Sequence, residues 1–263
     1  MKIFYFSGTG NSYILAKKLS EKITANLCSV SEFIHEKEIS FDDDAFGIVF
    51  PVYYGDIPNI IFNFCKKLRN IENKYIFIIS NYGGSPGTSF STTKKILAEY
   101  GVKISGFYGI QMPQNSFKKP KDNYENHIEK AEKLIDKIVL NTEKRKKVIQ
   151  TTNNLRYLLF KPFDILLKPI YRKHLIKESG IEDSRENMIY HLDRSFSTDD
   201  KCISCGKCVS VCPVDNIILS DGKPLWKNKC ENCLSCYNFC PTQAIKTTLS
   251  EDNYYYKNPD YII

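Results

Sequence analysis

The sequence lacks the features of a membrane-spanning or exported protein. The longest window without a charged residue, 75–93 of the 263 residues, is rich in Gly, Ser, Thr, Asn and Pro, which is typical of loops rather than of a membrane span. The apolar stretch nearest the N-terminus, residues 3–6, is four residues long and runs into Ser-Gly-Thr-Gly, so a signal peptide is not expected. We therefore expect a cytoplasmic protein with no transmembrane segment.

Histidine and evenly spread positive charge are also lacking. The four histidines, at 35, 127, 174 and 191, are scattered, so none is expected in a metal site. The formal net charge is +7, yet residues 144–177 contain ten Lys or Arg and only one acidic residue. The rest of the chain is therefore slightly acidic, and binding of nucleic acid is not indicated. With 42% hydrophobic residues, the composition is that of a folded protein, and the length indicates about two domains.

Cysteine, in contrast, is abundant and crowded, because eight of the ten lie between residues 202 and 240. In a protein that is not exported, such crowding indicates metal or iron–sulfur ligation rather than disulfides. Two runs with the spacing Cys-x2-Cys-x2-Cys-x3-Cys-Pro repeat at an offset of 28 residues. Zinc sites usually take two separated cysteine pairs, so zinc is the weaker alternative.

The two runs resemble the motif of bacterial ferredoxins that carry two clusters. The resemblance implies a small α+β domain over 196–250 with two [4Fe–4S] clusters, each bound by the first three cysteines of one run and the fourth of the other. One cluster would be bound by Cys202, Cys205, Cys208 and Cys240. The other would be bound by Cys230, Cys233, Cys236 and Cys212. Cys28 and Cys65 lie outside this domain and are interpreted as buried, unreactive thiols.

Residues 1–147 alternate between strand and helix patterns. The expected strands are 2–7, 27–30, 45–50, 75–80 and 102–112. The expected helices are 11–23, 59–68, 88–100 and 123–147. Five strands that alternate with helices indicate an α/β domain with a doubly wound parallel sheet.

A loop with the sequence Ser7-Gly8-Thr9-Gly10-Asn11-Ser12 follows the first expected strand and opens the first helix. Glycines let the backbone approach an anion, hydroxyls add donors, and a helix N-terminus attracts negative charge, so the loop is predicted to bind phosphate. It is not a Walker A loop, because no lysine precedes Lys17. A dinucleotide fingerprint would place Gly or Ala where Tyr13 stands, but Glu32 as a ribose-binding acid keeps that alternative open.

This loop resembles the phosphate loop of flavodoxins, and the similarity extends over the five-strand pattern of residues 1–146. It implies a flavodoxin-like sheet with strand order 2-1-3-4-5 that binds FMN, whose phosphate would be held by Ser7, Thr9, Gly10, Asn11 and Ser12. Loops after the third and fourth strands lie where a flavodoxin holds the flavin ring. They add the expected FMN contacts Pro51, Val52, Tyr53, Tyr54, Gly55, Asn81, Tyr82, Gly83 and Gly84. Tyr53, Tyr54 or Tyr82 would stack on the ring, and the two glycines after Tyr82 favour an open flavin face.

Residues 148–195 are interpreted as a connector with short helices, because Pro162 and Pro169 interrupt an apolar and basic stretch. The basic segment 144–177 can pack between domains or protomers, bind an acidic redox partner such as a ferredoxin, or lie on an anionic membrane surface. A homodimer is left open, and no function is assigned to the C-terminal tail, 251–263.

Together the two halves resemble flavodoxin–ferredoxin fusion proteins, a type best known from anaerobic bacteria and archaea. The resemblance implies electron transfer in which single electrons pass through two [4Fe–4S] clusters to or from FMN. No catalytic acid or base stands out, so an enzyme of this kind would be an oxidoreductase (EC 1) whose chemistry belongs to its cofactors. The alternatives are a pure electron carrier for a partner reductase and an oxygen- or redox-sensing iron–sulfur protein. A small-molecule electron acceptor is left open.

Overall fold

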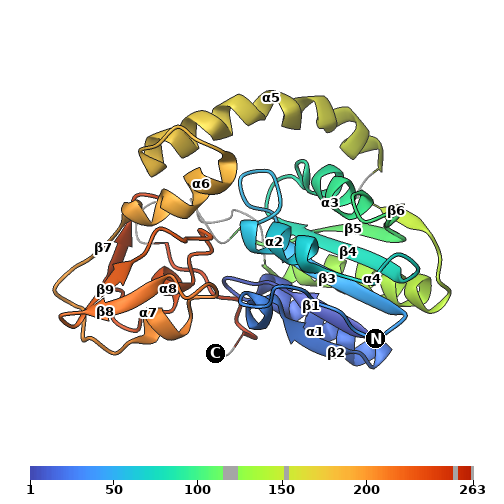
Figure 1. Ribbon diagram of the computed structural model, residues 1–263, viewed down its shortest axis with the longest axis horizontal. Helices are drawn as coiled ribbons and strands as arrows, with labels where there is room; N and C mark the ends of the chain where they lie inside the picture. The colour runs from blue at the N-terminus through green and yellow to red at the C-terminus, as the bar shows by residue number, and fades with distance from the viewer. Residues whose placement is uncertain (115–123, 151–153, 251–253, 262–263) are drawn as a thin grey trace. The chain divides into compact units, whose positions relative to one another are not determined.

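The computed structural model describes residues 1–114, 124–150, 154–250 and 254–261 (Figure 1). The described residues form two compact units, and each is described by itself. The first contains those of Met1–Ser7, Asn11–Pro113 and Pro120–Lys168. The second contains those of Gly8–Gly10, Gln114–Lys119 and Pro169–Ile263.

The first unit is built on a six-stranded parallel sheet with the order β2-β1-β3-β4-β5-β6. The strands are β1 (Lys2–Tyr5), β2 (Asn26–Ser29), β3 (Ala45–Pro51), β4 (Tyr75–Tyr82), β5 (Gly106–Gln111) and β6 (Val148–Gln150). β3 and β4 are buried along their whole length, as expected of central strands covered on both faces. The predicted α/β class and the order 2-1-3-4-5 of the first five strands are confirmed.

The sixth strand is a correction to the prediction, which expected five strands and ended the first domain at residue 147. β6 pairs in parallel with β5, where Gly106 is the partner of Val148, and Val148 N donates to Ser105 O at 2.9 Å. Three residues directly after four basic ones are too few to show the alternation that identifies a strand. Pairing with β5 therefore determines this edge strand, and the sheet extends past residue 147.

Helices cover both faces of the sheet (Figure 1). They are α1 (Asn11–Ile23), α2 (Asn59–Lys67), α3 (Ser89–Ala98) and α4 (Tyr124–Glu143), with the 3-10 turn η1 (Val30–Phe33) after β2. α1 packs with α4, and their Leu15, Leu19 and Ile135 belong to one buried cluster with sheet residues. α2 packs with α3, and Phe64 of α2 lies 4.9 Å from Phe4 of β1 between ring centroids. These two apolar layers hold the carboxyl ends of the strands, where the candidate FMN loops begin.

The second unit contains two small antiparallel sheets and short helices. The strands are β7 (Phe196–Thr198) paired with β10 (Ile245–Thr247), and β8 (Ile217–Ser220) paired with β9 (Lys223–Trp226). The helices are α6 (Arg185–Tyr190), the 3-10 turn η2 (His191–Ser195), α7 (Lys207–Ser210) and α8 (Ser235–Asn238). Phe196 and Trp226 stack with centroids 5.7 Å apart in its core. This small α+β architecture agrees with the prediction for the C-terminal domain.

The 28-residue sequence repeat is also a structural repeat. α7 and α8 begin at equivalent positions, as do β8 and β10. Left-handed backbone recurs at the same offset, with φ of 56°, 71° and 51° at Ser204, Gly206 and Asp215, and of 51°, 59° and 54° at Asn232, Leu234 and Gln243. The left-handed region costs a residue with a side chain about 1–2 kcal/mol, so its retention at a leucine shows how strongly the loop conformation is determined.

The predicted connector contains one long helix, α5 (Asn154–Ser179), where Pro162 and Pro169 were expected to break the chain into short helices. That expectation is wrong for residues 154–179, and short helices occur only afterwards, as α6 and η2. Each proline removes one backbone donor, but the Leu, Lys and Arg around them favour a helix. None of the helices in the described part of the chain combines the length and apolarity needed to cross a bilayer.

Candidate cofactor sites

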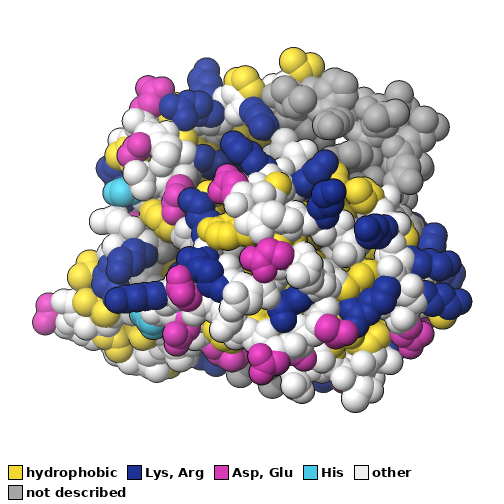
Figure 2. All heavy atoms as spheres, turned by 45° about the vertical axis from the view of Figure 1, so that its right-hand side comes forward, with side chains coloured by type: hydrophobic (Ala, Val, Ile, Leu, Met, Phe, Trp, Pro, Cys, Tyr) yellow, Lys and Arg dark blue, Asp and Glu magenta, His cyan; other side chains and the backbone are white. Residues whose placement is uncertain are grey.

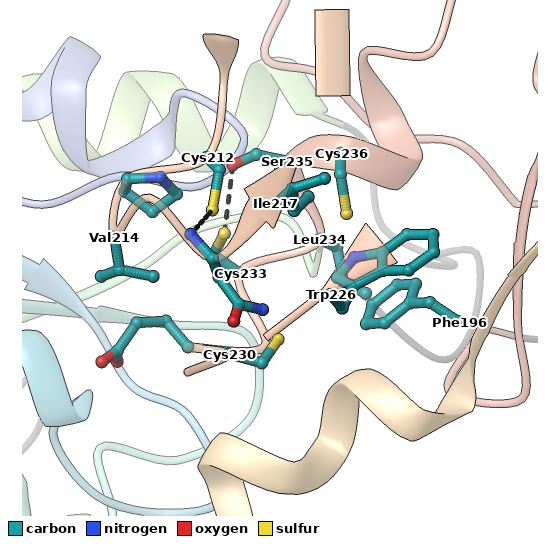
Figure 3. Close-up of a pocket in the computed structure, with 13 residues that line it drawn as sticks. Phe196, Cys212, Val214, Ile217, Trp226, Cys230, Cys233, Leu234, Ser235 and Cys236 are labelled. Atoms are coloured by element: carbon teal, nitrogen blue, oxygen red, sulfur yellow. Dashed lines mark hydrogen bonds between the residues drawn. The ribbon is translucent and has the colours of Figure 1, made fainter. Parts of the chain in front are cut away.

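Four cysteines line one cavity in the second unit (Figure 3). They are Cys212, Cys230, Cys233 and Cys236, called here the inner set, and they are the four that the sequence grouped around one cluster. The cavity has an empty volume of about 310 Å³, part of it open to solvent, and apolar side chains such as Trp226 form much of the remaining wall. The structure therefore brings together cysteines from both runs.

The loop from Cys230 to α8 wraps around this cavity because of its backbone conformation. Left-handed residues at Asn232 and Leu234 fold the loop back on itself. Asn232 N donates to Cys230 Sγ at 3.2 Å, and the Ser235 hydroxyl lies 3.2 Å from Cys233 Sγ. Hydrogen bonds to sulfur of this kind stabilise the negative charge of cluster thiolates and adjust their potentials.

Burial of the inner set tests whether an iron–sulfur cluster fits. Burial raises the pKa of the Cys233 thiol to about 12 and raises the pKa values of Cys230 and Cys236 well above their usual range. Thiolates here thus need nearby positive charge, which the iron of a cluster provides. No three His, Cys, Asp or Glu side chains of the described residues are arranged to hold a single metal ion. Four cysteine sulfurs around one cavity with apolar walls are a donor set that fits an iron–sulfur cluster.

The other four cysteines, Cys202, Cys205, Cys208 and Cys240, are called the outer set, because none of them is buried. Cys208 is half-buried, and burial raises the pKa of its thiol. Cys240 Sγ accepts from Ala244 N at 3.3 Å and lies 3.7 Å from the Thr242 hydroxyl. Its place beside the other three stays a prediction.

The expected phosphate loop connects β1 to α1 in the predicted position. Thr9, Asn11 and Ser12 are buried, and Gly10 has a φ of 103°, which a residue with a side chain rarely adopts. The Ser12 hydroxyl donates to Asn81 Oδ1, a residue at the end of β4 that was independently expected to contact FMN. The N-terminus of α1, which carries no acidic residue in its first turn, completes an anion-binding arrangement.

The two loops expected around the flavin ring are bonded to each other. Tyr53 and Asp56 exchange backbone hydrogen bonds of 2.9 and 3.0 Å around left-handed Tyr54 and Gly55, which makes a tight turn. Thr88 N donates to Gly55 O at 2.7 Å. Val52 N donates to the backbone oxygen of Asn81 at a distance of 2.8 Å. The side-chain amide of Gln111 donates to the backbone oxygen of Gly83, also at 2.8 Å. All three expected loops thus follow strands β1, β3 and β4, at the edge where doubly wound sheets bind ligands.

The three tyrosines expected near the ring differ in burial. Tyr53 and Tyr54 are half-buried, whereas Tyr82 is only 7% exposed. Pro51 and Asn81 are also buried, and Gly84 has open space around its α-carbon. Which tyrosine stacks on FMN stays a prediction.

Glu32, which the dinucleotide alternative would use to bind a ribose, instead caps a short helical turn. Its carboxylate accepts from Ser29 N at 3.3 Å, and the Ser29 hydroxyl accepts from Ser31 N, so the pair caps the η1 turn. This structural role disfavours Glu32 as a ribose ligand. Of the two isolated cysteines, Cys65 is fully buried as predicted, but Cys28 is only half-buried.

Sequence reasoning missed a buried polar network beside the inner set. Asn216 Nδ2 donates to Asp193 Oδ2 at 2.9 Å, and both side chains are at most 3% exposed. Asn228 N donates to the same carboxylate oxygen at 2.8 Å. The only available signal was that asparagine occupies the position where the second repeat has Ala244.

The phosphate loop on an α/β sheet and the cysteine-lined cavity define a flavin and iron–sulfur protein. Comparison with protein families gives a match to a flavodoxin domain over residues 2–108 and to a 4Fe-4S dicluster domain over residues 201–245. The chain is thus a flavodoxin domain followed by a ferredoxin-type domain, as in a flavodoxin–ferredoxin fusion. These domains make it an FMN and iron–sulfur electron-transfer protein.

Solved structures similar to the chain include flavodoxins, a putative flavoprotein and an oxidoreductase with a longer chain. A putative flavoprotein from Bacteroides uniformis is 17% identical, with 49% of this chain and 96% of that chain covered and a TM-score of 0.34. A Streptococcus pneumoniae flavodoxin is 15% identical, with coverage of 53% and 97% and a TM-score of 0.34. Rubredoxin oxygen:oxidoreductase from Desulfovibrio gigas is 14% identical, with coverage of 55% and 36% and a TM-score of 0.38. No curated protein sequence matches the chain significantly.

Proposed function

We propose that the protein conducts single electrons through two [4Fe–4S] clusters, one held by the inner set and one by the outer set, to or from FMN. The observation that carries the proposal is the cavity lined by Cys212 from the first run and three cysteines from the second. Bound clusters would supply one-electron steps, and FMN would supply one- or two-electron steps. The protein's own residues bind these groups and set the polarity around them.

The phosphate loop and the two ring loops support FMN binding without acid–base catalysis. Thr9 and Ser12 place buried hydroxyls in the loop, and the α1 N-terminus adds favourable electrostatics for a phosphate. Asp56 is the acidic residue within these loops, but its carboxylate accepts from Ile57 N at 2.8 Å and from the Thr92 hydroxyl at 2.9 Å. A carboxylate committed to two donors stabilises a turn. This supports an electron-transfer role in preference to proton transfer by the protein.

Cofactor analysis of anaerobically purified protein tests the proposal. We expect about eight irons, matching acid-labile sulfide and about one FMN per chain. About four irons per chain after reconstitution with iron and sulfide would contradict the two-cluster assignment. Clusters without flavin, even after incubation with excess FMN, would contradict the electron path to FMN.

We further propose that the basic segment 144–177 binds an acidic redox partner protein. Lys144, Lys146 and Lys147 are exposed between α4 and β6, and Lys168 of α5, in the same unit, is also exposed. On the face drawn in Figure 2, basic and acidic side chains are intermixed, whereas residues 144–177 contain ten Lys or Arg and one acidic residue. Complementary charge raises the rate of association between redox partners, most strongly at low salt.

A charge-matched pair of variants tests this surface. Replacement of Lys144, Lys146 and Lys147 by serine should slow reduction by an acidic ferredoxin at least severalfold at low ionic strength, with a smaller effect at high salt. The control replaces exposed lysines at 94, 95 and 103, which removes the same charge from another part of the first unit. Equal rates in the two variants would overturn the docking proposal.

A further inference from the structure

Asn216 connects the two cysteine runs that supply the inner set. Its backbone N donates to Cys212 Sγ at 3.2 Å, on the first run. Its side-chain Oδ1 accepts from Lys227 N at 3.1 Å and from Lys229 N at 2.7 Å, directly before Cys230 on the second run. The residue is 1% exposed, so water does not replace these partners readily.

The amide end of the same side chain is fixed by a buried carboxylate. Asn216 Nδ2 donates to Asp193 Oδ2, which also accepts from Asn228 N. Three successive backbone N–H groups, of residues 227 to 229, are therefore held by two side chains. The side chains of Asn216 and Asp193, which precede the second run in the sequence, therefore hold the backbone that leads into Cys230.

The equivalent position in the second repeat supplies an internal comparison. Ala244 N donates to Cys240 Sγ at 3.3 Å, and Ala244 O accepts from Asp199 N at 3.0 Å. In the first repeat, the corresponding bonds run from Asn216 N to Cys212 Sγ and from Lys227 N to Asn216 O, the second at 2.9 Å. Ala244 has no polar side chain, and Lys201 N instead donates to nearby Asp199 Oδ1 at 3.0 Å. The backbone bonds are common to both repeats, whereas the side-chain bridge occurs only at the inner set.

We infer that Asn216 is a positioning residue for the inner set, which holds Cys212 and the Cys230 loop in the geometry that retains a cluster. The inference rests on the proposed function, since it assumes that the inner set binds a cluster. It assigns to Asn216 and Asp193 a specific effect on one of two otherwise similar cysteine sets. Among the described residues no such bridge joins the two runs at the outer set, so we expect loss of the amide to leave that set unchanged.

The test replaces Asn216 by alanine in the full-length, cluster-loaded protein. Alanine is the residue of the other repeat and preserves both backbone bonds, so the variant is expected to fold. It leaves Lys229 N and Asp193 Oδ2 with fewer partners, and we expect about tenfold faster release of the inner cluster to an excess of iron chelator, the size expected for a lost buried hydrogen bond. Lys227→Ala and Lys229→Ala are controls, because these residues contribute only backbone N–H groups and their side chains are exposed.

The measurements are iron released against time and the electron paramagnetic resonance spectrum of the reduced protein. Wild type and variant should both start near eight irons per chain, and in the variant about half of the iron should leave in a fast phase while one cluster's signal changes. Equal acceleration of both halves, or release at the wild-type rate, would overturn the inference. A wild-type protein that binds no more than four irons after reconstitution would instead contradict the proposed function, so the two failures are distinguishable.

Discussion

Ser12 allows a quantitative test of FMN binding, because its hydroxyl already has a partner. The hydroxyl donates its single hydrogen to Asn81 Oδ1 in a buried position. A phosphate oxygen that takes this hydrogen gains a charge-assisted bond of about 1.5–3 kcal/mol but breaks a neutral bond of about 0.5–1.5 kcal/mol. The net contribution of Ser12 is therefore about 1 kcal/mol, and Ser12→Ala should weaken FMN binding by about fivefold.

The assay is titration of flavin-free protein with FMN, followed by quenching of flavin fluorescence. Ser20→Ala is the matched control, because Ser20 lies on the same helix, is buried, and donates to Lys17 O at 2.8 Å. It should leave the Kd for FMN unchanged. A Ser12→Ala protein that binds FMN as tightly as the Ser20→Ala protein would refute the reasoning that this loop binds phosphate.

Three further predictions concern the cysteines and the repeat. Cys212→Ala should lower the iron content from about eight to about four per chain, measured after anaerobic reconstitution, and retention of eight would contradict its place in the inner set. Burial raises the pKa of Cys65 to about 12, so the folded protein should resist iodoacetamide at that position at pH 8, and prompt labelling in a peptide map would contradict this. Leu234→Gly relieves about 1–2 kcal/mol of backbone strain but removes a buried leucine worth about 2–5 kcal/mol, so a net loss of about 2 kcal/mol is expected from unfolding curves. Gly206→Ala at the equivalent position has space for its methyl group and should lose only about 1–2 kcal/mol, and a gain in stability for Leu234→Gly would show that strain outweighs the buried leucine.

Much of the first domain could be predicted because its signals are local. The helix over 11–23 has the expected bounds, and the strand from Ala45 was visible as an apolar run. β6 could not be predicted in this way, because three residues have no periodicity and only their pairing with β5 identifies them. α5 was misjudged because the penalty of two prolines was given more weight than the helix propensity of the residues around them.

In the inner set, too, features that depend on contacts between distant residues could not be predicted from the sequence. The resemblance of the two runs to the two-cluster ferredoxin motif grouped Cys212 with the second run. The bridge through Asn216 was not predictable, because its partners are backbone groups whose positions depend on the folded loop. A side chain that bonds to distant backbone leaves no pattern in the sequence.

The exchange of a cysteine between the two runs has a consequence for the synthesis of the protein. Cys212 is made before the second run, but the inner cavity also needs Cys230, Cys233 and Cys236. A ribosome that has released only the first run therefore exposes cysteines with no completed site, and iron delivered at that stage finds an open chain. On the proposed assignment, the inner cluster forms only after residue 236 has emerged and the outer cluster only after residue 240, so the order of the cysteines along the polypeptide determines the order of maturation.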